Sequence, residues 1–303
     1  MAKRKYEEWI TRNPLKKSKQ AEITAPMIAY KGDSGGKDLT FDWSCVSKPL
    51  VMYKERQTND FDQVIAFTGS NLNDYEDFQA EIELSLGKEG KKYTITGPQV
   101  VYIPMGLTFG QLNFKRVDKP ISYMNFYLSS KFSQKGTESD YSKYMAKPRI
   151  TRNTIEFKTF VEGKLFRERK IPNYEMNCQG QDFGGCNLSI FWYTVTHAHV
   201  MEEPTHSHHF DMWVVFLGGD YRKVGGLGAE MEMWWGKEAE KLTIDSTSVV
   251  HIPAELIHRS IDYRRISKPF THINLFTSPK YYKDQVFSEK GDITDIKMAE
   301  GSN

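Results

Sequence analysis

The first 196 of the 303 residues contain no histidine, and all eight histidines of the chain lie between His197 and His272. Packing alone would spread this residue along the chain, whereas histidine is also the commonest metal ligand in proteins. The uneven distribution therefore divides the chain into a part without imidazole chemistry and a part that concentrates it. We treat the histidine-rich part as the candidate functional region.

Cysteine is scarce as well, and the three residues Cys45, Cys178 and Cys186 do not form the even, dense pattern of a disulfide scaffold. Reduced thiols suit a cytoplasmic protein, which is the localisation we expect. The sequence also lacks an apolar run of about 18 residues and, near its start, the apolar segment of a secretory signal. We therefore expect no membrane partner.

Charge of one sign is not in excess, since 41 basic and 39 acidic residues give a net charge of +2. This balance gives no reason to expect nucleic acid as a partner. The exception is residues 1–34, in which lysine and arginine outnumber the acidic residues. A basic arm can bind nucleic acid, but we favour a solvated tail or a brace across the second subunit of a homodimer.

The sequence repeats itself at a fixed offset of 149 residues, from residue 35 to about residue 131. About a third of the positions are identical without a gap, including Trp43 with Trp192 and Asp62 with Asp211. Self-similarity of this kind indicates two copies of one structural unit. The predicted organisation is a basic arm, a first domain, a connector, a second domain and a C-terminal tail, at residues 1–34, 35–131, 132–183, 184–280 and 281–303.

Short segments rich in β-branched and aromatic residues, with Gly, Pro or Asn nearby, predict strands throughout both copies. Those expected in the first copy are Asp62–Phe67, Glu81–Leu86, Gln99–Ile103 and Tyr123–Leu128. Many short strands with few helices favour an all-β fold of two tandem jelly-roll barrels. Short helices are expected at residues 6–12 and 279–285, and an edge hairpin in the connector at Phe157–Val161 and Leu165–Arg169.

His206, His208 and His258 are the candidate metal ligands. In an extended strand residues i and i+2 share a face, so His206 and His208 point the same way. His258 follows a strand that ends at Pro253, where the chain can turn back towards that pair. Imidazole nitrogens suit Fe, Mn, Zn, Ni or Cu. We predict one divalent transition metal per chain, with iron slightly favoured.

The first copy has lost every one of the corresponding histidines. Gln57 and Asn59 stand at the positions of His206 and His208, and aromatic residues replace His251, His258 and His272, namely Tyr102, Phe109 and Tyr123. Aromatic rings fill large volumes in a core. We infer that the first barrel is structural and the second carries the site. His251 and His272 either line that site or are core residues hydrogen-bonded to the backbone.

Other residues of the second copy are candidates for the pocket around the metal. Trp192 and Trp213 belong to an excess of indoles in this copy, which suggests an apolar pocket for a ring or a carbon chain. Asp211 lies next to the histidines, but it is retained as Asp62 in the copy without them. That retention favours a structural role for Asp211, such as capping a turn.

These motifs resemble those of the cupin superfamily, and the doubled chain resembles a bicupin. The resemblance rests on His206-x-His208, on the apolar strand that ends at Gly218-Gly219, and on Pro253-x-Glu255-x-x-His258. It implies a metal-dependent enzyme that acts on a small organic acid or aromatic compound by dioxygenation, decarboxylation or isomerisation. The sequence departs from the family pattern at Met212, near which the family has a glutamate ligand, and at Glu255, where the family has glycine.

Two other interpretations stay open beside the enzyme. The chain is alternatively a small-molecule-binding or sensory cupin without turnover, or a structural pair of barrels with incidental metal binding. The sequence identifies no catalytic residue and gives no sign of an organic cofactor. Fold alone does not decide between these functions, because one fold hosts many of them.

Overall fold

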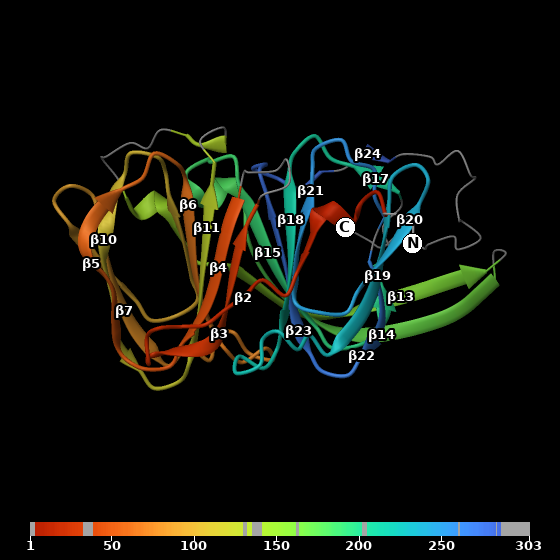
Figure 1. Ribbon diagram of the computed structural model, residues 1–303, viewed down its shortest axis with the longest axis horizontal. Helices are drawn as coiled ribbons and strands as arrows, with labels where there is room; N and C mark the ends of the chain where they lie inside the picture. Colours follow the sequence, from red (N-terminus) through yellow and green to blue (C-terminus); the bar gives the residue numbers. More distant parts are fainter. Residues whose placement is uncertain are drawn as a thin grey trace.

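The structure is a computed structural model. It describes residues 4–32, 39–129, 132–134, 141–161, 164–201, 205–259, 261–282 and 284–285, with the backbone alone described for residues 155–161, 164–169 and 284–285. Two β-barrels lie side by side in it (Figure 1). Each barrel pairs a seven-stranded sheet with a four-stranded sheet. The prediction of an all-β fold with two tandem barrels is confirmed.

The first barrel is built mainly from the first copy of the repeat. Its seven-stranded sheet has the order β12 (Met145–Ala146), β9 (Gln99–Ile103), β6 (Gln63–Gly69), β11 (Ile121–Leu128), β4 (Leu39–Val46), β3 (Ile23–Lys31) and β2 (Leu15–Lys16). Its four-stranded sheet has the order β5 (Leu50–Thr58), β10 (Thr108–Val117), β7 (Ala80–Leu86) and β8 (Lys91–Ile95).

The second barrel repeats this arrangement. Its seven-stranded sheet has the order β1 (Ile10–Arg12), β21 (Ser248–Ile252), β18 (Met212–Gly218), β23 (Phe270–Phe276), β15 (Ser189–Val195), β14 (Lys164–Cys178) and β13 (Arg149–Val161). Its four-stranded sheet has the order β16 (His199–Val200), β22 (Asp262–Ile266), β19 (Ala229–Trp235) and β20 (Glu240–Ile244). A separate short pair joins β17 (His206–Ser207) to β24 (Asp284–Gln285).

Helical structure among the described residues is confined to short 3₁₀ turns, which are η1 (Glu7–Trp9), η3 (Ser142–Tyr144) and η4 (Gly180–Phe183). The helix expected at residues 6–12 is therefore only one turn long, because the chain enters β1 at Ile10. The helix expected at 279–285 is wrong, since this stretch ends in β24. Backbone pairing with neighbouring strands overrides the weak local preference in both places. The connector hairpin is present as β13 and β14, with β13 at the sheet edge.

The two barrels exchange edge strands. The segment before the first barrel gives a strand to the second barrel, and the segment before the second barrel gives a strand to the first. β1, at the start of the chain, pairs with β21 of the second barrel, with Ile10 opposite Val250. β12, from the connector, pairs with β9 of the first barrel, with Met145 opposite Val101. The start of the basic arm thus lies on the second barrel of the same chain, where Lys5 binds Glu238, whereas the rest of the arm forms β2 and β3 of the first barrel. This exchange ties the two barrels together.

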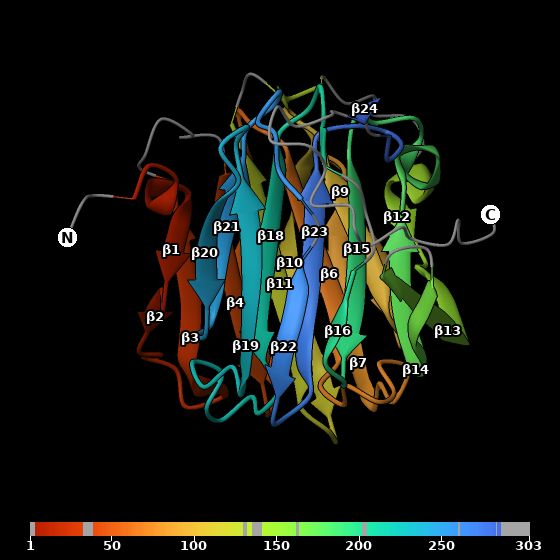
Figure 2. The same cartoon turned by 90° about the vertical axis from the view of Figure 1, so that its right-hand side faces the viewer.

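The two seven-stranded sheets face each other at the centre of the molecule, and the four-stranded sheets lie outside (Figures 1 and 2). Successive side chains of a strand point to opposite faces. In β18, Trp213, Val215 and Leu217 join the core shared with the first barrel, whereas Val214 and Phe216 join the second barrel's own core. The strands of the central sheets are buried on both faces, which explains why their sequences are nearly continuously apolar.

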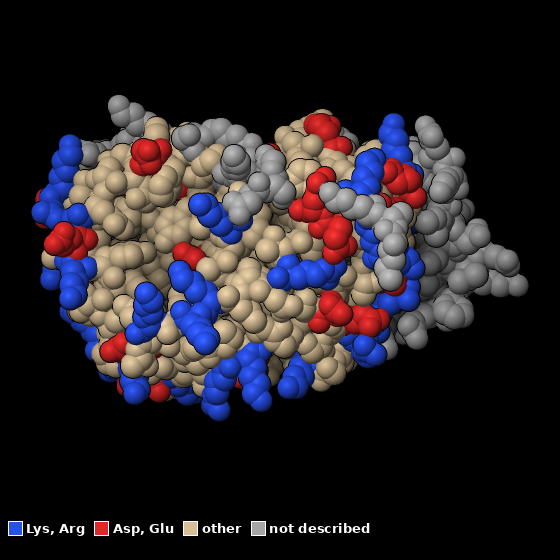
Figure 3. All heavy atoms as spheres, viewed as in Figure 1, with Lys and Arg blue, Asp and Glu red and all other residues tan. Residues whose placement is uncertain are grey.

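The outer surface carries both signs of charge. Basic and acidic side chains are spread over the face seen in Figure 3. No helix among the described residues is long and apolar enough to cross a membrane.

Candidate metal centre

His206 and His258 are held opposite each other by the backbone. The His206 N–H donates to the His258 carbonyl at 3.0 Å, and the His258 N–H donates to the His206 carbonyl at the same distance. This isolated bridge joins β17 to the turn that follows β21. The main chain therefore fixes the spacing of the two imidazoles before any ion binds.

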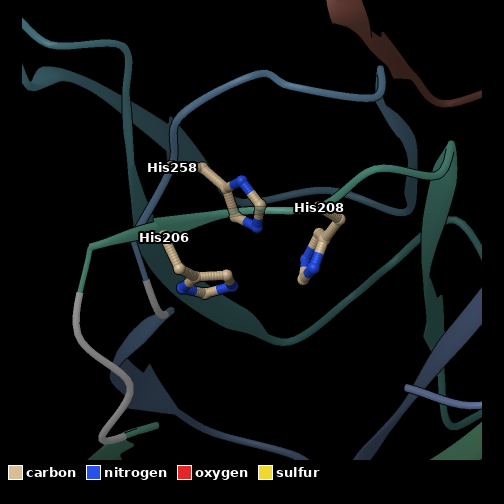
Figure 4. Close-up of side chains that lie close together, drawn as sticks. All are labelled: His206, His208 and His258. Carbon is tan, nitrogen blue, oxygen red and sulfur yellow. The ribbon is translucent and has the colours of Figure 1, made fainter. Parts of the chain in front are cut away.

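His208 completes the group, and the three rings converge on one space (Figure 4). The candidate ligand atoms of His206, His208 and His258 all lie within 4.8 Å of one another. Their ring centroids are 4.4 to 4.9 Å apart, and the side chains are 1 to 3% exposed. The structure thus brings together the three residues that the sequence predicts as ligands.

Hydrogen bonds from the ring Nδ1 atoms to backbone carbonyls orient the rings of His208 and His258. The Nδ1 atom of His208 lies 3.0 Å from the Tyr282 carbonyl oxygen, and that of His258 lies 2.9 Å from the Leu256 carbonyl oxygen. A carbonyl oxygen only accepts, so each Nδ1 carries the hydrogen and donates it. The lone pair is then on Nε2. Metal-binding histidines commonly show this arrangement, because a carbonyl acceptor fixes both the tautomer and the ring orientation.

The donor set fits a divalent transition metal. Bonds from such a metal to imidazole nitrogen are about 2.0–2.1 Å long, so nitrogens that share an ion lie roughly 3–4 Å apart. The candidate ligand atoms, all within 4.8 Å of one another, lie close to this spacing. Three neutral nitrogens on one side of an ion leave coordination positions open for a small molecule.

A turn with left-handed backbone places His258. Glu255 has φ of 67°, and its N–H donates to the His208 carbonyl at 2.7 Å. The equivalent residue of the first barrel is Gly106, with φ of 83°. Glycine adopts this conformation without steric cost, whereas an L residue is strained there. The Glu255 carboxylate contacts the His209 ring, so the departure from glycine adds an exposed carboxylate–imidazole contact beside the centre.

Two of the three histidines, His206 and His258, line a cavity of about 190 Å³ inside the second barrel. Its walls are mostly apolar, and its polar groups include Arg259, His272 and Asn274. The other lining residues are Phe191, Tyr193, Met201, His206, Met212, Val214, Met233, Ile252, His258, Ile261 and Tyr281. No carboxylate side chain is among the described residues that line it.

His272, one of the predicted pocket residues, lies in this cavity. Its Nδ1 atom is 2.6 Å from the Tyr263 hydroxyl, and its Nε2 atom is 2.7 Å from the Asn274 side-chain oxygen. The first barrel has Phe114 and Tyr123 in place of Tyr263 and His272. A buried pair of titratable groups beside the cavity is therefore a feature of the second barrel.

His251 and Asp211 are hydrogen-bonded to each other at 2.8 Å and do not line the cavity. Placing them in the pocket was wrong, because His251 points to the other face of β21 and stacks on Trp213 at 4.7 Å. The equivalent residues of the first barrel make the same link, from the Tyr102 hydroxyl to the Asp62 carboxylate. Burial raises the pKa of this carboxyl group. Both copies therefore use the aspartate as a structural cross-link, as its retention suggested.

Trp192 and Trp213 lie in the core between the two barrels, and assigning them to the metal-side pocket was wrong. On β15, Phe191 and Tyr193 point into the cavity, so Trp192 between them points away from it. Trp213 alternates in the same way with Met212 and Val214 on β18. No alternation of apolar and polar residues distinguishes the two faces of these strands, because both faces are buried.

Sequence reasoning missed Arg259 and Tyr281, which line the cavity. A signal for Arg259 was present in the repeat, since the residue after the third ligand is Gly110 in the first copy and arginine in the second. Tyr281 lies just beyond the end of the repeat, where no internal comparison was available. Asn274 is retained as Asn125 and so resembled a structural residue.

No protein-family model matches the chain, and no curated protein is similar to it in sequence. Solved structures do resemble it in fold. AerE from Microcystis aeruginosa has a TM-score of 0.53 at 10% identity, with 89% of this chain and 98% of that chain covered. A mutant of Bacillus subtilis oxalate decarboxylase gives 0.56 at 7% identity, with 88% and 76% covered. Lactobacillus farciminis oxalate decarboxylase with formate gives 0.55 at 10% identity, with 88% and 85% covered.

At such low sequence identity, a similar structure shows a shared fold and nothing further about the protein. The neighbours and this chain share tandem barrels with the same overall course over most of their lengths. The paired seven- and four-stranded sheets and the 149-residue repeat agree with that likeness. The chain therefore has the tandem two-barrel fold of these solved structures.

Proposed function

We propose that the second barrel binds one divalent transition metal through His206, His208 and His258 and uses it to transform a small organic acid. The observation that carries this proposal is a cluster of three buried imidazoles, two of which, His206 and His258, line a cavity whose described lining contains Arg259 and no carboxylate. Such a cavity is suited to a metal and an anion together.

The metal is proposed to be manganese or iron, from the set that imidazole ligands accept. The neighbouring Bacillus subtilis oxalate decarboxylase has Mn(II) centres, which supports manganese as the first metal to test. When bound, the ion supplies Lewis acidity and open coordination positions to a substrate oxygen.

The charge of the site selects for an anion. Three neutral ligands leave the charge of the ion uncompensated, and the Arg259 guanidinium adds a further positive charge at the cavity wall. Guanidinium groups bind carboxylates through two parallel hydrogen bonds. The volume of about 190 Å³ lies below the usual range for drug-sized ligands, so the acid is small.

The apolar wall acts on the rest of the substrate. Side chains such as Met212, Met233 and Ile252 hold the carbon body and exclude water. Exclusion of water strengthens each electrostatic interaction inside the cavity. The same wall keeps a reactive carbon away from solvent protons.

His272 is proposed as the group that holds a proton at the cavity wall. In a decarboxylation the bond to the carboxyl carbon breaks, carbon dioxide leaves, and a proton takes its place on the remaining carbon. His272 supplies that proton by turning its Nε2–H from the Asn274 side-chain oxygen to the carbon, while the Tyr263 hydroxyl donates to Nδ1 and keeps the ring in place. The fold likeness to oxalate decarboxylases makes decarboxylation the first reaction to test, ahead of dioxygenation and isomerisation.

The test is an assay of the Mn²⁺- and Fe²⁺-loaded protein against small mono- and dicarboxylates, oxalate included. Carbon dioxide release and oxygen uptake are measured in parallel, because they separate decarboxylation from dioxygenation. Arg259→Gln should raise KM for the acid without loss of metal. Full metal occupancy with no carboxylate binding would contradict the enzyme and favour the structural alternative. Binding without turnover would favour a sensory cupin.

A homodimer and a cytoplasmic location remain predictions about the whole protein. Light scattering at several protein concentrations tests the first, and fractionation of cells tests the second. Neither outcome alters the proposal for the metal centre.

A further inference from the structure

The polar groups that line the cavity lie at different depths in the second barrel. The His208 ring stacks on Phe210 at 4.7 Å, and Phe210 stacks on Phe276 at 5.3 Å, so the metal centre lies at the Phe276 end of β23. His272 lies four residues from Phe276 on that strand. Successive residues of a strand are about 3.3 Å apart, so these two levels are separated by about 13 Å.

The four-stranded sheet shows the same separation. His258 forms a bridge with Trp235, the last residue of β19. Tyr263, whose hydroxyl contacts His272, pairs with Met231, four residues before Trp235. The metal centre and the pair of Tyr263 and His272 therefore lie at different depths on both walls of the barrel.

Asn274 lies between the two levels and offers a hydrogen-bond donor to the cavity. Its side-chain oxygen accepts from Nε2 of His272 at 2.7 Å, whereas its side-chain nitrogen has no hydrogen-bond partner among the described residues. Asn274 is partly exposed and lines the cavity, although its counterpart Asn125 in the first barrel is buried. Since β23 lies in the middle of a seven-stranded sheet, the exposed part of Asn274 faces the cavity.

Positive charge is confined to the end of the cavity that holds the metal centre. Arg259, which follows the ligand His258, is the only lysine or arginine among the described residues that line the cavity. His272 accepts at Nδ1 from the Tyr263 hydroxyl and donates at Nε2 to Asn274, so its ring is neutral. A charged group of a ligand that is buried beside these neutral side chains alone has no partner, which costs free energy.

We propose that the cavity takes an oxo acid, an inference that rests on the proposed function and names its substrate class. The carboxylate binds at the metal centre and Arg259, and the carbon body lies against Met212, Val214 and Met233. The oxo oxygen accepts from the side-chain nitrogen of Asn274. Oxalate is too short to reach both groups, since Asn274 lies two residues, or about 7 Å, from the level of the metal centre. A longer dicarboxylate reaches both, but it buries a second negative charge without a cation beside it.

Three acids with carbon chains of the same length test this class. Levulinate carries a ketone towards the end far from its carboxylate, valerate carries no second polar group there, and glutarate carries a second carboxylate. Isothermal titration of the Mn²⁺-loaded protein should give levulinate an affinity about fivefold higher than that of valerate, the factor expected for one net hydrogen bond. Glutarate should bind more weakly than valerate, because its second charge loses its hydration.

Matched asparagine variants of the two barrels locate the donor. Asn274→Leu keeps the volume of the side chain and removes the amide, so levulinate should bind no more tightly than valerate. Asn125→Leu removes the equivalent amide from the first barrel and should leave the preference for levulinate intact. Circular dichroism shows whether each variant is folded. If Asn274→Leu does not fold, the comparison of levulinate with valerate in the unaltered protein decides the question.

Failure of this inference can be distinguished from failure of the proposed function. Equal affinities for levulinate and valerate, tightest binding of glutarate, or an unchanged preference for levulinate in Asn274→Leu would overturn the oxo acid and leave the proposed metal site intact. Binding of none of the three acids by the metal-loaded protein would overturn the proposed function and this inference with it.

Discussion

The two barrels follow the same backbone plan and differ in what fills them. In the first, a hydrogen-bonded series occupies the interior: Asn59 donates to Gln63 at 2.9 Å, Gln63 donates to Asn125 at 2.9 Å, and the Tyr123 hydroxyl donates to Asn125 at 3.2 Å. Phe109, at the position of the third metal ligand, is fully buried. In the first barrel these inward-facing polar groups are therefore hydrogen-bonded to one another.

The second barrel directs its inward-facing polar groups at a cavity instead. Met212 replaces Gln63, which removes the centre of the hydrogen-bonded series, and His208 replaces Asn59. Asn274 remains, but it contacts His272 rather than a glutamine. Because these exchanges touch only inward-facing positions, the strands stay in register. One barrel scaffold therefore serves stability or binding according to a few interior residues.

The largest expected effect is the loss of metal from the second barrel in acid. Histidine must be neutral to bind a metal, so protons compete at all three ligands at once. Metal affinity is therefore retained above the ordinary histidine pKa and falls as the pH drops below about 6. Titration with a competing chelator measures this. Full occupancy at about pH 4.5 would contradict a site made of histidine ligands.

Removal of one ligand should have the next largest effect. His208→Ala should weaken metal binding by more than about 100-fold, since even loss of an orienting contact costs about 10–100-fold. The matched control is Asn59→Ala in the first barrel, which should leave the metal affinity unchanged. Isothermal titration of both variants with Mn²⁺ checks the pair. Similar losses in the two variants would show that the barrels are not divided as described.

Cavity formation distinguishes the two interiors in the metal-free protein. Phe109→Ala removes a fully buried ring and should lower the free energy of unfolding by about 3–5 kcal/mol. His258→Ala at the equivalent position should cost much less, because its ring already faces a cavity. Denaturant unfolding of both variants measures the difference. Equal losses would mean that both barrels have the same kind of interior.

The smallest expected effect concerns the turn before the third ligand. Glu255→Gly should relieve left-handed strain and raise the free energy of unfolding by about 1 kcal/mol, less any contribution of the exposed contact with His209. The counterpart Gly106→Ala should cost about the same amount, and the added Cβ meets no atom within 4 Å there. Thermal unfolding of the two variants checks both signs. A stability loss in Glu255→Gly would mean that its carboxylate matters more than its backbone.

The repeat made most of the fold predictable. β6 and β18, β7 and β19, and β9 and β21 begin and end at positions 149 residues apart, as an ungapped duplication requires. The ligand histidines could be predicted equally well. The two-residue period of a strand puts His206 and His208 on the same face, and the turn at Pro253 brings His258 back towards them. The internal comparison then separated the barrel with histidines from the barrel without them.

What escaped prediction has physical causes. Strands buried on both faces carry no alternation of apolar and polar residues, so the inward face could not be told from the outward one. That ambiguity put Trp213 and His251 in the pocket. The exchange of β1 and β12 between the barrels depends on long-range pairing, which leaves no local pattern in the sequence. Tyr281 lines the cavity but lies beyond the repeat, so no residue of the first copy corresponds to it.

The number of metal ions bound per chain tests most directly whether only the second barrel binds metal. Elemental analysis of the protein loaded with Mn²⁺ and freed of excess ion should give a value near one. The value should fall to near zero when His206 and His258 are both replaced by alanine, and stay near one when Gln57 and Phe109 are replaced instead. A value near two, or metal retained without His206 and His258, would contradict the division into a structural barrel and a metal-binding barrel.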